Sequence, residues 1–269
     1  MSNKAGRNQG PKVLFFDIET APIRAFVWGL WDQNVGLNQI KTDWHILSWA
    51  AKWLDSDTVM YADQRGVKNV EDDKRLLKGI WDLLDEADIV VTQNGKKFDV
   101  KKLNARFIIN GFKPPSSYQH IDTLEIAKKK FAFTSNKLEY LSNTLNAKYK
   151  KLVGNREFEG FKLWEECLNG NLKAWREMER YNKYDVLALE ELYSKLIAWD
   201  SRINFSLYTE GTEHLCTCGS TRLHKRGYEY TATGKYQRYQ CQECGKWSRG
   251  AVNLFTREKS QSLTRNVKG

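Results

Sequence analysis

The sequence contains no long uninterrupted apolar run. No stretch approaches the roughly 20 residues that a helix needs to cross a bilayer. The first residues do not follow the charged, apolar and small succession of a secretory signal. These absences argue against a membrane protein and predict a cytoplasmic location.

Cysteine is scarce as well, with five in 269 residues. In a reducing compartment so few cysteines do not predict a disulfide framework. Four of them fall in the last quarter of the chain as two close pairs, a spacing typical of metal sites. The fifth, Cys167, shares a predicted helix face with Trp164 and Leu168, which predicts a buried, inert thiol.

Apolar side chains are abundant overall, at 41% hydrophobic and 13% aromatic residues, so the chain is expected to fold. Its length allows one full-sized domain and a small module. The net charge of +10 is uneven, because residues 201–269 hold twelve Lys or Arg against five Asp or Glu. A basic block of this kind favours a polyanionic partner.

Hydrophobic periodicity divides the chain into a flexible basic arm (1–12), a large domain (13–200), a small module (211–256) and a disordered tail (257–269). Extended runs predict strands at 13–20, 44–53, 58–62, 88–93 and 120–123. Helical spacing predicts helices at 72–87, 98–110, 124–131, 137–146, 160–169 and 172–199. A meander followed by alternating helices and strands predicts an α/β fold with a mixed five-stranded sheet flanked by helices.

Two acids interrupt the first predicted strand. Asp17 and Glu19 are two positions apart, so a strand places both carboxylates on one face and Phe16 and Ile18 on the other. Neighbouring anions on an apolar strand repel each other, and a divalent cation is the simplest compensation. For a bare Asp-x-Glu, a strand end whose acids point into water is the better explanation, so this motif alone is a weak signal.

Two further acids stand in similar company. Asp185 falls within the core-facing stripe of the last long helix, with Tyr181 one turn earlier, and requires either a metal or a buried salt bridge. Asp99 begins a helix after the strand at 88–93, where it could simply complement the helix dipole. In open α/β sheets, ligands bind at such strand ends, which favours one shared site.

Together these motifs resemble a known family. Asp17-Ile18-Glu19-Thr20, Asn94-x3-Phe98-Asp99 and Tyr181-x3-Asp185 look like the three motifs of DEDDy-type 3′→5′ exonucleases, in the DnaQ-like group of the ribonuclease H-like superfamily. The second motif is spaced as in the proofreading domains of family B DNA polymerases. The resemblance covers about 11–200. Arg180 stands where the histidine variant of the family would carry its histidine.

The resemblance implies a ribonuclease H-like fold and two Mg²⁺ or Mn²⁺ ions. Asp17 would bridge both ions, Glu19 and Asp185 would complete one, and Asp99 would hold the other through water. Oxygen ligands without histidine suit these metals. Tyr181 would orient the attacking water. By the same resemblance, the terminal nucleotides would be contacted by Thr20, Asn94 and Phe98.

Aromatic residues between the first two strands follow no clear period. Phe26, Trp28 and Trp31 are expected either to pack into the core or to stack against a terminal base. The sequence leaves both alternatives open.

The small module contains Cys216-x-Cys218 and Cys241-x2-Cys244, which predict a structural tetrahedral zinc site. The segment resembles zinc ribbons found beside nucleic-acid enzymes, although its first pair is one residue short, so Cys216 and His214 both remain candidates for the fourth ligand. Between the pairs we expect a two-stranded ribbon whose single cationic and aromatic face binds nucleic acid or covers a small core. Its predicted contacts are Arg226, Tyr228, Tyr230, Lys235, Tyr236 and Arg238.

The sequence therefore predicts a free-standing, metal-dependent 3′→5′ exonuclease that acts on nucleic acid, with DNA favoured over RNA and single strands or 3′ ends as substrates. A replication or recombination protein is a candidate partner. The alternatives are a structure-specific endonuclease and a non-catalytic nucleic-acid-binding or recruitment protein.

Overall fold

The computed structural model describes residues 10–150 and 157–267. The chain forms two compact units, a larger one over Lys12–Tyr193 and a smaller one that includes Ser194–Gly269. Most of the flexible arm predicted at 1–12 lies outside the described residues. Within the described part of the chain, no helix is both long and apolar enough to cross a membrane.

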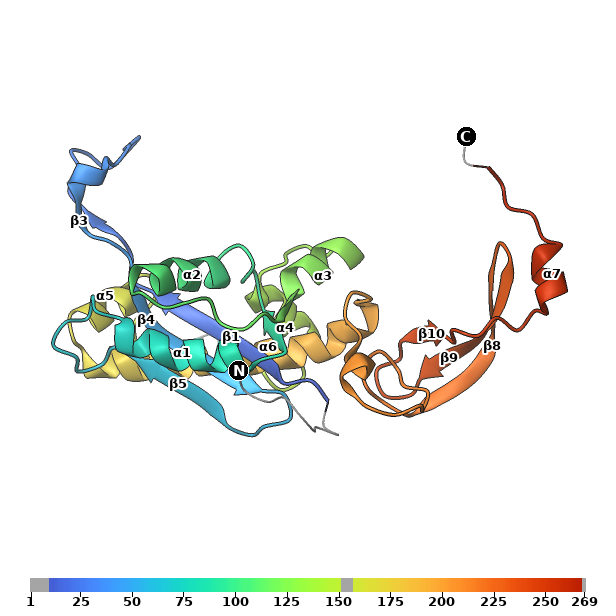
Figure 1. Ribbon diagram of the computed structural model, residues 1–269. Coiled ribbons are helices and arrows are strands. Elements are labelled where there is room, and N and C mark those ends of the chain that lie inside the picture. Colours follow the sequence, from blue (N-terminus) through green and yellow to red (C-terminus); the bar gives the residue numbers. More distant parts are fainter. Residues whose placement is uncertain (1–9, 151–156, 268–269) are drawn as a thin grey trace. The chain divides into compact units, whose positions relative to one another are not determined.

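The larger unit is built on a mixed five-stranded sheet, as the sequence predicts (Figure 1). Its strands are β1 (Val13–Thr20), β4 (Ile46–Trp53), β5 (Val59–Asp63), β6 (Ile89–Thr92) and β7 (Gln119–Asp122). Their order is β5-β4-β1-β6-β7. The meander β1, β4 and β5 is antiparallel, whereas β6 and β7 join parallel to β1. β1 is therefore the central strand, at the change from antiparallel to parallel pairing.

Helices cover the sheet, as the alternating pattern predicts. They are α1 (Lys74–Glu86), α2 (Asp99–Ile109), α3 (Thr123–Lys130), α4 (Leu138–Leu145), α5 (Lys162–Leu168) and α6 (Leu172–Leu196). One core packs α1 and α2 against β1 through Leu14, Phe16 and Ile18. The 25-residue α6 lies on the other face, where Tyr193 packs against Phe15.

A second core lies between α5, α6, the residue that follows β1 and the start of β4. It is built from Ala21, Leu47, Leu163, Trp175 and neighbouring apolar residues. Cys167 belongs to this cluster and is 1% exposed. Burial raises the pKa of its thiol to about 12, which confirms a buried and unreactive cysteine.

The segment between β1 and β4 forms a small structure of its own, which no periodicity in the sequence predicted. Two short strands, β2 (Arg24–Ala25) and β3 (Ile40–Thr42), pair antiparallel, and the 3-10 turn η1 (Leu37–Gln39) precedes β3. Figure 1 shows this segment, in blue, extending away from the rest of the larger unit.

The smaller unit is a three-stranded antiparallel sheet of order β10-β9-β8. Its elements are β8 (Leu223–Thr231), β9 (Gly234–Cys241) and β10 (Trp247–Arg249), with the 3-10 turns η2 (Ile197–Trp199) and η3 (Phe205–Tyr208) before them and α7 (Arg257–Gln261) after them.

The tail was predicted to be disordered from 257 onward, and the structure differs. It forms α7, and Asn253 donates to Ser260 Oγ (2.9 Å) and to Thr233 O in the hairpin turn (3.4 Å). Arg265 Nη2 also donates to Thr233 Oγ1 (3.1 Å). The tail residues that the structure describes are thus tied to the hairpin by polar contacts, which composition does not reveal.

Candidate active site

The central strand β1 carries the two acids of the first motif beyond the end of its parallel partner. β1 pairs with β6 only over Val13–Phe15, whereas its pairing with β4 continues to Thr20. The section that contains Asp17 and Glu19 is therefore open on the β6 side. Phe16 and Ile18 lie on the opposite face of β1 from Asp17 and Glu19 and are buried against α1 and α2, as the strand period predicts.

Asp17 is held by a side chain that the sequence did not single out as functional. Asn182 of α6 donates through Nδ2 to Asp17 Oδ2 (2.7 Å) and accepts from Ser48 Oγ of β4 (3.1 Å). Asn182 is fully buried, so its amide has one orientation that satisfies both partners. Asn182 lies 165 positions from its partner Asp17, so no local pattern in the sequence reveals this contact.

Asp99 is the first residue of α2, and it reaches the open side of β1. Its Oδ1 accepts from the backbone N of Ile18 at 3.2 Å, and the residue is 4% exposed. The sequence allowed Asp99 a role in complementing the helix dipole, and its carboxylate also satisfies a backbone donor of β1.

The loop before Asp99 is shaped by close packing. A Cβ at Gly95 would lie 2.3 Å from Thr92 Oγ1, so only glycine fits there. Asn94 adopts a left-handed conformation (φ 66°), and its backbone N donates to Asp122 Oδ1 (2.8 Å). Asp122 also accepts from Leu124 N (3.0 Å) and so fixes this loop to the start of α3.

Tyr181 and Asp185 lie one turn apart on α6, beside a tryptophan of α5. The rings of Tyr181 and Trp164 meet edge to face, with centroids 6.2 Å apart and planes at 76°. Trp164 Nε1 donates to Glu19 Oε2 at 3.2 Å. Trp164 therefore positions both Glu19 and Tyr181, a role that its place on an apolar helix face did not suggest.

The charges of three of the acids act on the fourth, Asp17, which indicates that the four acids belong to one site. The pKa of Asp17 is raised well above its ordinary value by burial first, and then by the charges of Asp99, Glu19 and Asp185. The hydrogen bond from Asn182 acts in the opposite direction and lowers this pKa. Burial also raises the pKa of Asp99 to about 7. Four carboxyl groups in mutual repulsion suit a site that takes cations.

The acids fit hard divalent cations by their chemistry. In the part of the chain that the structure describes, they do not form a group whose ligand oxygens all lie within 4.8 Å of one another. An all-oxygen donor set suits hard divalent cations.

The residues predicted to meet the terminal nucleotides lie around these acids. Thr20 ends β1 next to Glu19, at a register shift against β4. Phe98 directly precedes Asp99 and is 39% exposed, so its ring is accessible. Asn94 lies in the tight loop that leads to it. The structure thus gathers these three residues at the motifs that carry the acids.

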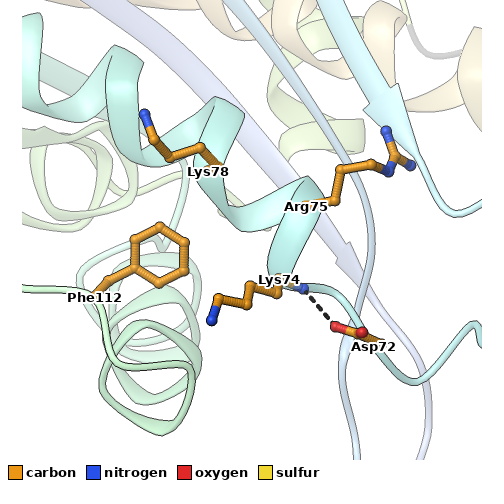
Figure 2. A pocket seen from close by; sticks show the side chains of 5 residues that line it. All are labelled: Asp72, Lys74, Arg75, Lys78 and Phe112. Carbon is orange, nitrogen blue, oxygen red and sulfur yellow. Dashed lines mark hydrogen bonds between the residues drawn. The ribbon is translucent and has the colours of Figure 1, made fainter.

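A surface pocket of about 550 Å³ lies elsewhere, along α1 (Figure 2). It is lined by Asp72, Lys74, Arg75, Lys78 and Phe112. Its cations have structural partners, because Arg75 Nη2 donates to Asp63 O (2.8 Å) and Lys78 pairs with Asp82. None of the residues that line this pocket is a predicted site residue. The candidate site is therefore identified by the group of acids around β1 and not by this pocket.

Candidate zinc site and ribbon

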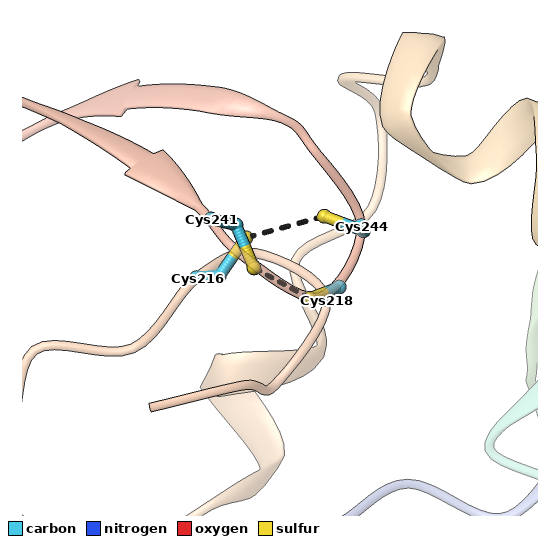
Figure 3. Close-up of side chains that lie close together, drawn as sticks. All are labelled: Cys216, Cys218, Cys241 and Cys244. Carbon is cyan, nitrogen blue, oxygen red and sulfur yellow. Dashed lines mark hydrogen bonds between the residues drawn. The ribbon is translucent and has the colours of Figure 1, made fainter. Parts of the chain in front are cut away.

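The four cysteines of the second unit form a compact group, with ligand atoms within 4.8 Å of one another (Figure 3). Cys216 Sγ lies 3.7 Å from Cys244 Sγ, and Cys218 Sγ lies 3.8 Å from Cys241 Sγ. A tetrahedral zinc with bonds of about 2.3 Å to sulfur separates its ligands by about 3.8 Å. The group is therefore compatible with a zinc ribbon.

The structure distinguishes between the two candidates for the fourth ligand. Cys216 is fully buried and lies in the group, whereas the ring of His214 packs on Tyr239 with centroids 5.5 Å apart. The short first pair is accommodated by a tight turn, in which Gly219 N donates to Cys216 O (2.8 Å) and Gly219 has φ 91°.

The predicted nucleic-acid contacts of the ribbon do not share one face, contrary to the sequence prediction. Tyr228 and Tyr230 lie with Lys235 on one face, where Lys235 Nζ is 3.9 Å from the Tyr228 ring centroid. Tyr236 and Arg238 lie on the opposite face. Successive side chains of β9 point to opposite faces of the sheet, so Lys235 and Tyr236 lie on different faces. The pairing of β8 with β9 also shifts register between Lys225 and Tyr228.

The second face contains two residues that the sequence analysis did not select. The guanidinium groups of Arg238 and Arg226 lie 4.7 Å and 5.9 Å from the ring of Trp247. Arg249 lies 4.1 Å from the Tyr236 ring. Both faces thus pair cations with aromatic rings, a combination that suits nucleic acid.

Comparison with known proteins

The mixed sheet, its flanking helices and the acids beside its central strand define an RNase H-like α/β domain. The family model of the RNase H superfamily matches residues 14–197. The chain therefore belongs to the RNase H superfamily. Membership supports a nuclease, and a nuclease-like fold implies nucleic-acid binding.

A solved structure agrees with this fold. The chain is similar to the family B DNA polymerase from the hyperthermophilic archaeon Pyrobaculum calidifontis, with a TM-score of 0.51 and 18% sequence identity. The match covers 71% of this chain and 25% of the polymerase, so this chain spans about a quarter of the polymerase's length. At this identity the likeness shows the fold alone. No curated protein matches the sequence.

Proposed function

We propose that this protein is a metal-dependent 3′→5′ exonuclease that hydrolyses phosphodiester bonds of nucleic acid, with DNA preferred to RNA. The observation that carries the proposal is the set of four acids around β1, each of the other three raising the pKa of Asp17.

Two Mg²⁺ or Mn²⁺ ions would be held by Asp17, Glu19, Asp99 and Asp185. When bound, such ions lower the pKa of an attacking water and stabilise the leaving oxygen. Asn182 keeps Asp17 in one orientation through its 2.7 Å hydrogen bond, and Trp164 does the same for Glu19. Preorganised ligands of this kind lose little freedom when the ions bind.

The protein's own groups position the substrate and the water. The Tyr181 hydroxyl orients the water, and the Trp164 ring restricts the tyrosine. Thr20, Asn94 and Phe98 hold the terminal nucleotides, with the accessible Phe98 ring as the stacking surface. In this arrangement the scissile phosphate lies beside the acids.

The second unit serves as a nucleic-acid-binding ribbon around one structural Zn²⁺ held by Cys216, Cys218, Cys241 and Cys244. Both cationic and aromatic faces of the hairpin contact the polyanion. The contacts are Arg226, Tyr228, Tyr230, Lys235, Tyr236 and Arg238, joined by Trp247 and Arg249.

Digestion of 5′-labelled and 3′-labelled DNA and RNA strands in Mg²⁺ or Mn²⁺ tests the proposal. A ladder of 5′-labelled products that shortens from the 3′ end, with DNA cut faster than RNA, is expected. Asp185→Asn is the matched control and should lose nearly all cleavage. A single internal cut would indicate an endonuclease. Binding without cleavage, or full activity of the Asp185→Asn variant, would overturn the proposal.

A further inference from the structure

The segment between β1 and β4 exposes side chains that a folded domain normally buries. Trp28 is 97% exposed, Trp31 83%, Leu30 87% and Phe26 72%. We call residues 23–42 the aromatic arm. Clustered exposed apolar side chains mark an interaction surface, so the arm does not serve the core of its own unit.

The root of the arm is fixed beside the candidate active site. Directly after β1, Ala21 N donates to His45 O at 2.8 Å. Arg24 Nη2 then donates to Thr42 Oγ1 (2.8 Å) and to Glu71 Oε1 (3.0 Å), which ties both short strands to the body of the unit. The arm therefore continues from the strand end that carries Glu19, and its root does not rely on the exposed rings.

The tip of the arm is organised by its own polar groups. Gly36 N donates to Gln39 Oε1 (2.8 Å), and Gln39 Nε2 donates to Phe26 O (2.9 Å). Phe26 N in turn donates to Gln39 O at 2.9 Å. These bonds join backbone groups on the two sides of the arm, while the aromatic rings remain exposed to solvent. The arm therefore presents its rings from an ordered loop.

Charge distinguishes the tip from the root. Residues 26–39 contain one charged side chain, Asp32, and no Lys or Arg. The tip therefore offers no cation to phosphates, and its large exposed side chains are rings and apolar groups. At the root, Lys102 Nζ lies 3.6 Å from the Trp44 ring centroid and 5.7 Å from that of Phe98. A cation next to aromatic rings suits a nucleic-acid strand.

We infer that the aromatic arm is a stacking platform for the unpaired bases of a nucleic-acid strand whose end lies at the acids. This inference rests on the proposed nuclease function. Trp28 and Trp31 stack on bases, while Lys102 meets a phosphate at the root. The shared strand with Glu19 and the cation at the root favour nucleic acid over a protein partner, which would not require either.

Binding of labelled strands to full-length variants tests the inference. Trp28→Ala with Trp31→Ala removes the rings, Trp28→Phe with Trp31→Phe keeps aromatic surface, and Ile108→Ala, at a residue 77% exposed on α2, controls for lost apolar surface. Anisotropy is measured without divalent ions, for a fluorescein-labelled DNA strand and for the same strand with abasic positions.

The alanine pair should weaken binding of the normal strand about tenfold or more. It should leave the abasic strand and the salt dependence unchanged, because the tip contributes no phosphate contact. The phenylalanine pair and Ile108→Ala should stay near wild type. Melting temperatures should not change, since the rings are exposed. If the alanine pair unfolds, the single variants Trp28→Ala and Trp31→Ala replace it: a loss in either variant on the normal strand alone supports stacking, and wild-type binding by both opposes it.

Cleavage by the wild type in Mg²⁺ separates the two proposals. If the wild type cleaves and the alanine pair binds both strands as the wild type does, the stacking platform is wrong and the nuclease stands. If no cleavage occurs but base-dependent binding requires the rings, the nuclease is wrong and the nucleic-acid platform stands. Equal losses on normal and abasic strands would overturn stacking. Unchanged nucleic-acid binding with ring-dependent self-association in sedimentation would make the arm a contact between copies and would also overturn it.

Discussion

Asp99 shows how a single carboxyl group links the site to stability. It accepts a hydrogen bond from Ile18 N, which favours the charged form, but burial dominates and raises its pKa from 3.8 to about 7. Between about pH 4 and pH 7, Asp99 therefore keeps its proton in the folded chain and has released it in the unfolded chain. The ionised form of Asp99 therefore opposes folding in the absence of metal.

The first prediction concerns pH. Because the folded pKa is raised, the unfolded state binds fewer protons between about pH 4 and pH 7, so the free energy of unfolding of the metal-free protein falls as pH rises through this window. Asp99 contributes up to about 4 kcal/mol of this fall. Asp99→Asn should flatten the curve and stabilise the metal-free protein above pH 7. Urea unfolding across the pH range measures it, and superimposable curves for both proteins would contradict the assignment.

The second prediction concerns Tyr181. Tyr181→Phe keeps the ring contact with Trp164 but removes the hydroxyl that we propose orients the water. We expect kcat to fall by about 10-fold to 100-fold with little change in KM. Tyr184→Phe is the matched control one turn on, because that hydroxyl donates to Lys150 O (2.5 Å). Steady-state cleavage compares them, and equal rates in both variants would reassign Tyr181 to packing.

At the scale of elements, the position of α2 depends on a buried acid outside the site. Asp73, before α1, accepts from Arg106 Nε (2.8 Å) and Nη2 (2.7 Å) of α2 and from Ile46 N of β4 (2.9 Å). Asp73 is fully buried. This network joins two helices to the sheet and so holds the helix that begins with Asp99.

The third prediction follows from that network. Asp73→Ala leaves the Arg106 charge and the Ile46 N–H without their partner, and should reduce the free energy of unfolding by about 3–5 kcal/mol. Asp82→Ala removes an exposed i,i+4 pair with Lys78 and should cost less than about 0.5 kcal/mol. Urea unfolding measures both. A loss at Asp73 as small as that at Asp82 would show that α2 is held by apolar packing alone.

At the scale of the whole molecule, the ribbon adds positive charge to the nuclease domain. The fourth prediction is that Cys241→Ser with Cys244→Ser abolishes zinc binding and weakens affinity for long DNA, because so small a module lacks a core of its own. The plot of log affinity against log salt should become less steep by about one for each lost phosphate contact. Cys167→Ala is the control that retains zinc.

Metal content is measured first, and then affinity across a salt series. Short substrates should still be cleaved, because the acids lie within the larger unit. If affinity and salt slope remain those of the wild type after zinc is lost, the ribbon serves another partner.

Much of this architecture is determined by the sequence itself. The five sheet strands and six helices of the larger unit follow from local periodicity, which needs no knowledge of distant residues. The acids of the three motifs are recognisable because charge is costly on a buried strand or helix face. The cysteine pairs are recognisable by spacing alone, and the turn at Gly219 explains why the shorter first pair still joins the group.

Tertiary structure decided the remaining features, because each depends on partners far away in the chain. From the sequence alone, Asn182 and Trp164 are ordinary residues on helix faces. Their contacts with Asp17 and Glu19 join positions 165 and 145 residues apart, which only the folded chain brings together. For Trp28 and Trp31 the sequence left core packing and base stacking both open, and only the folded arm shows that their rings are exposed. The two faces of the ribbon depend on a register shift that local patterns do not encode.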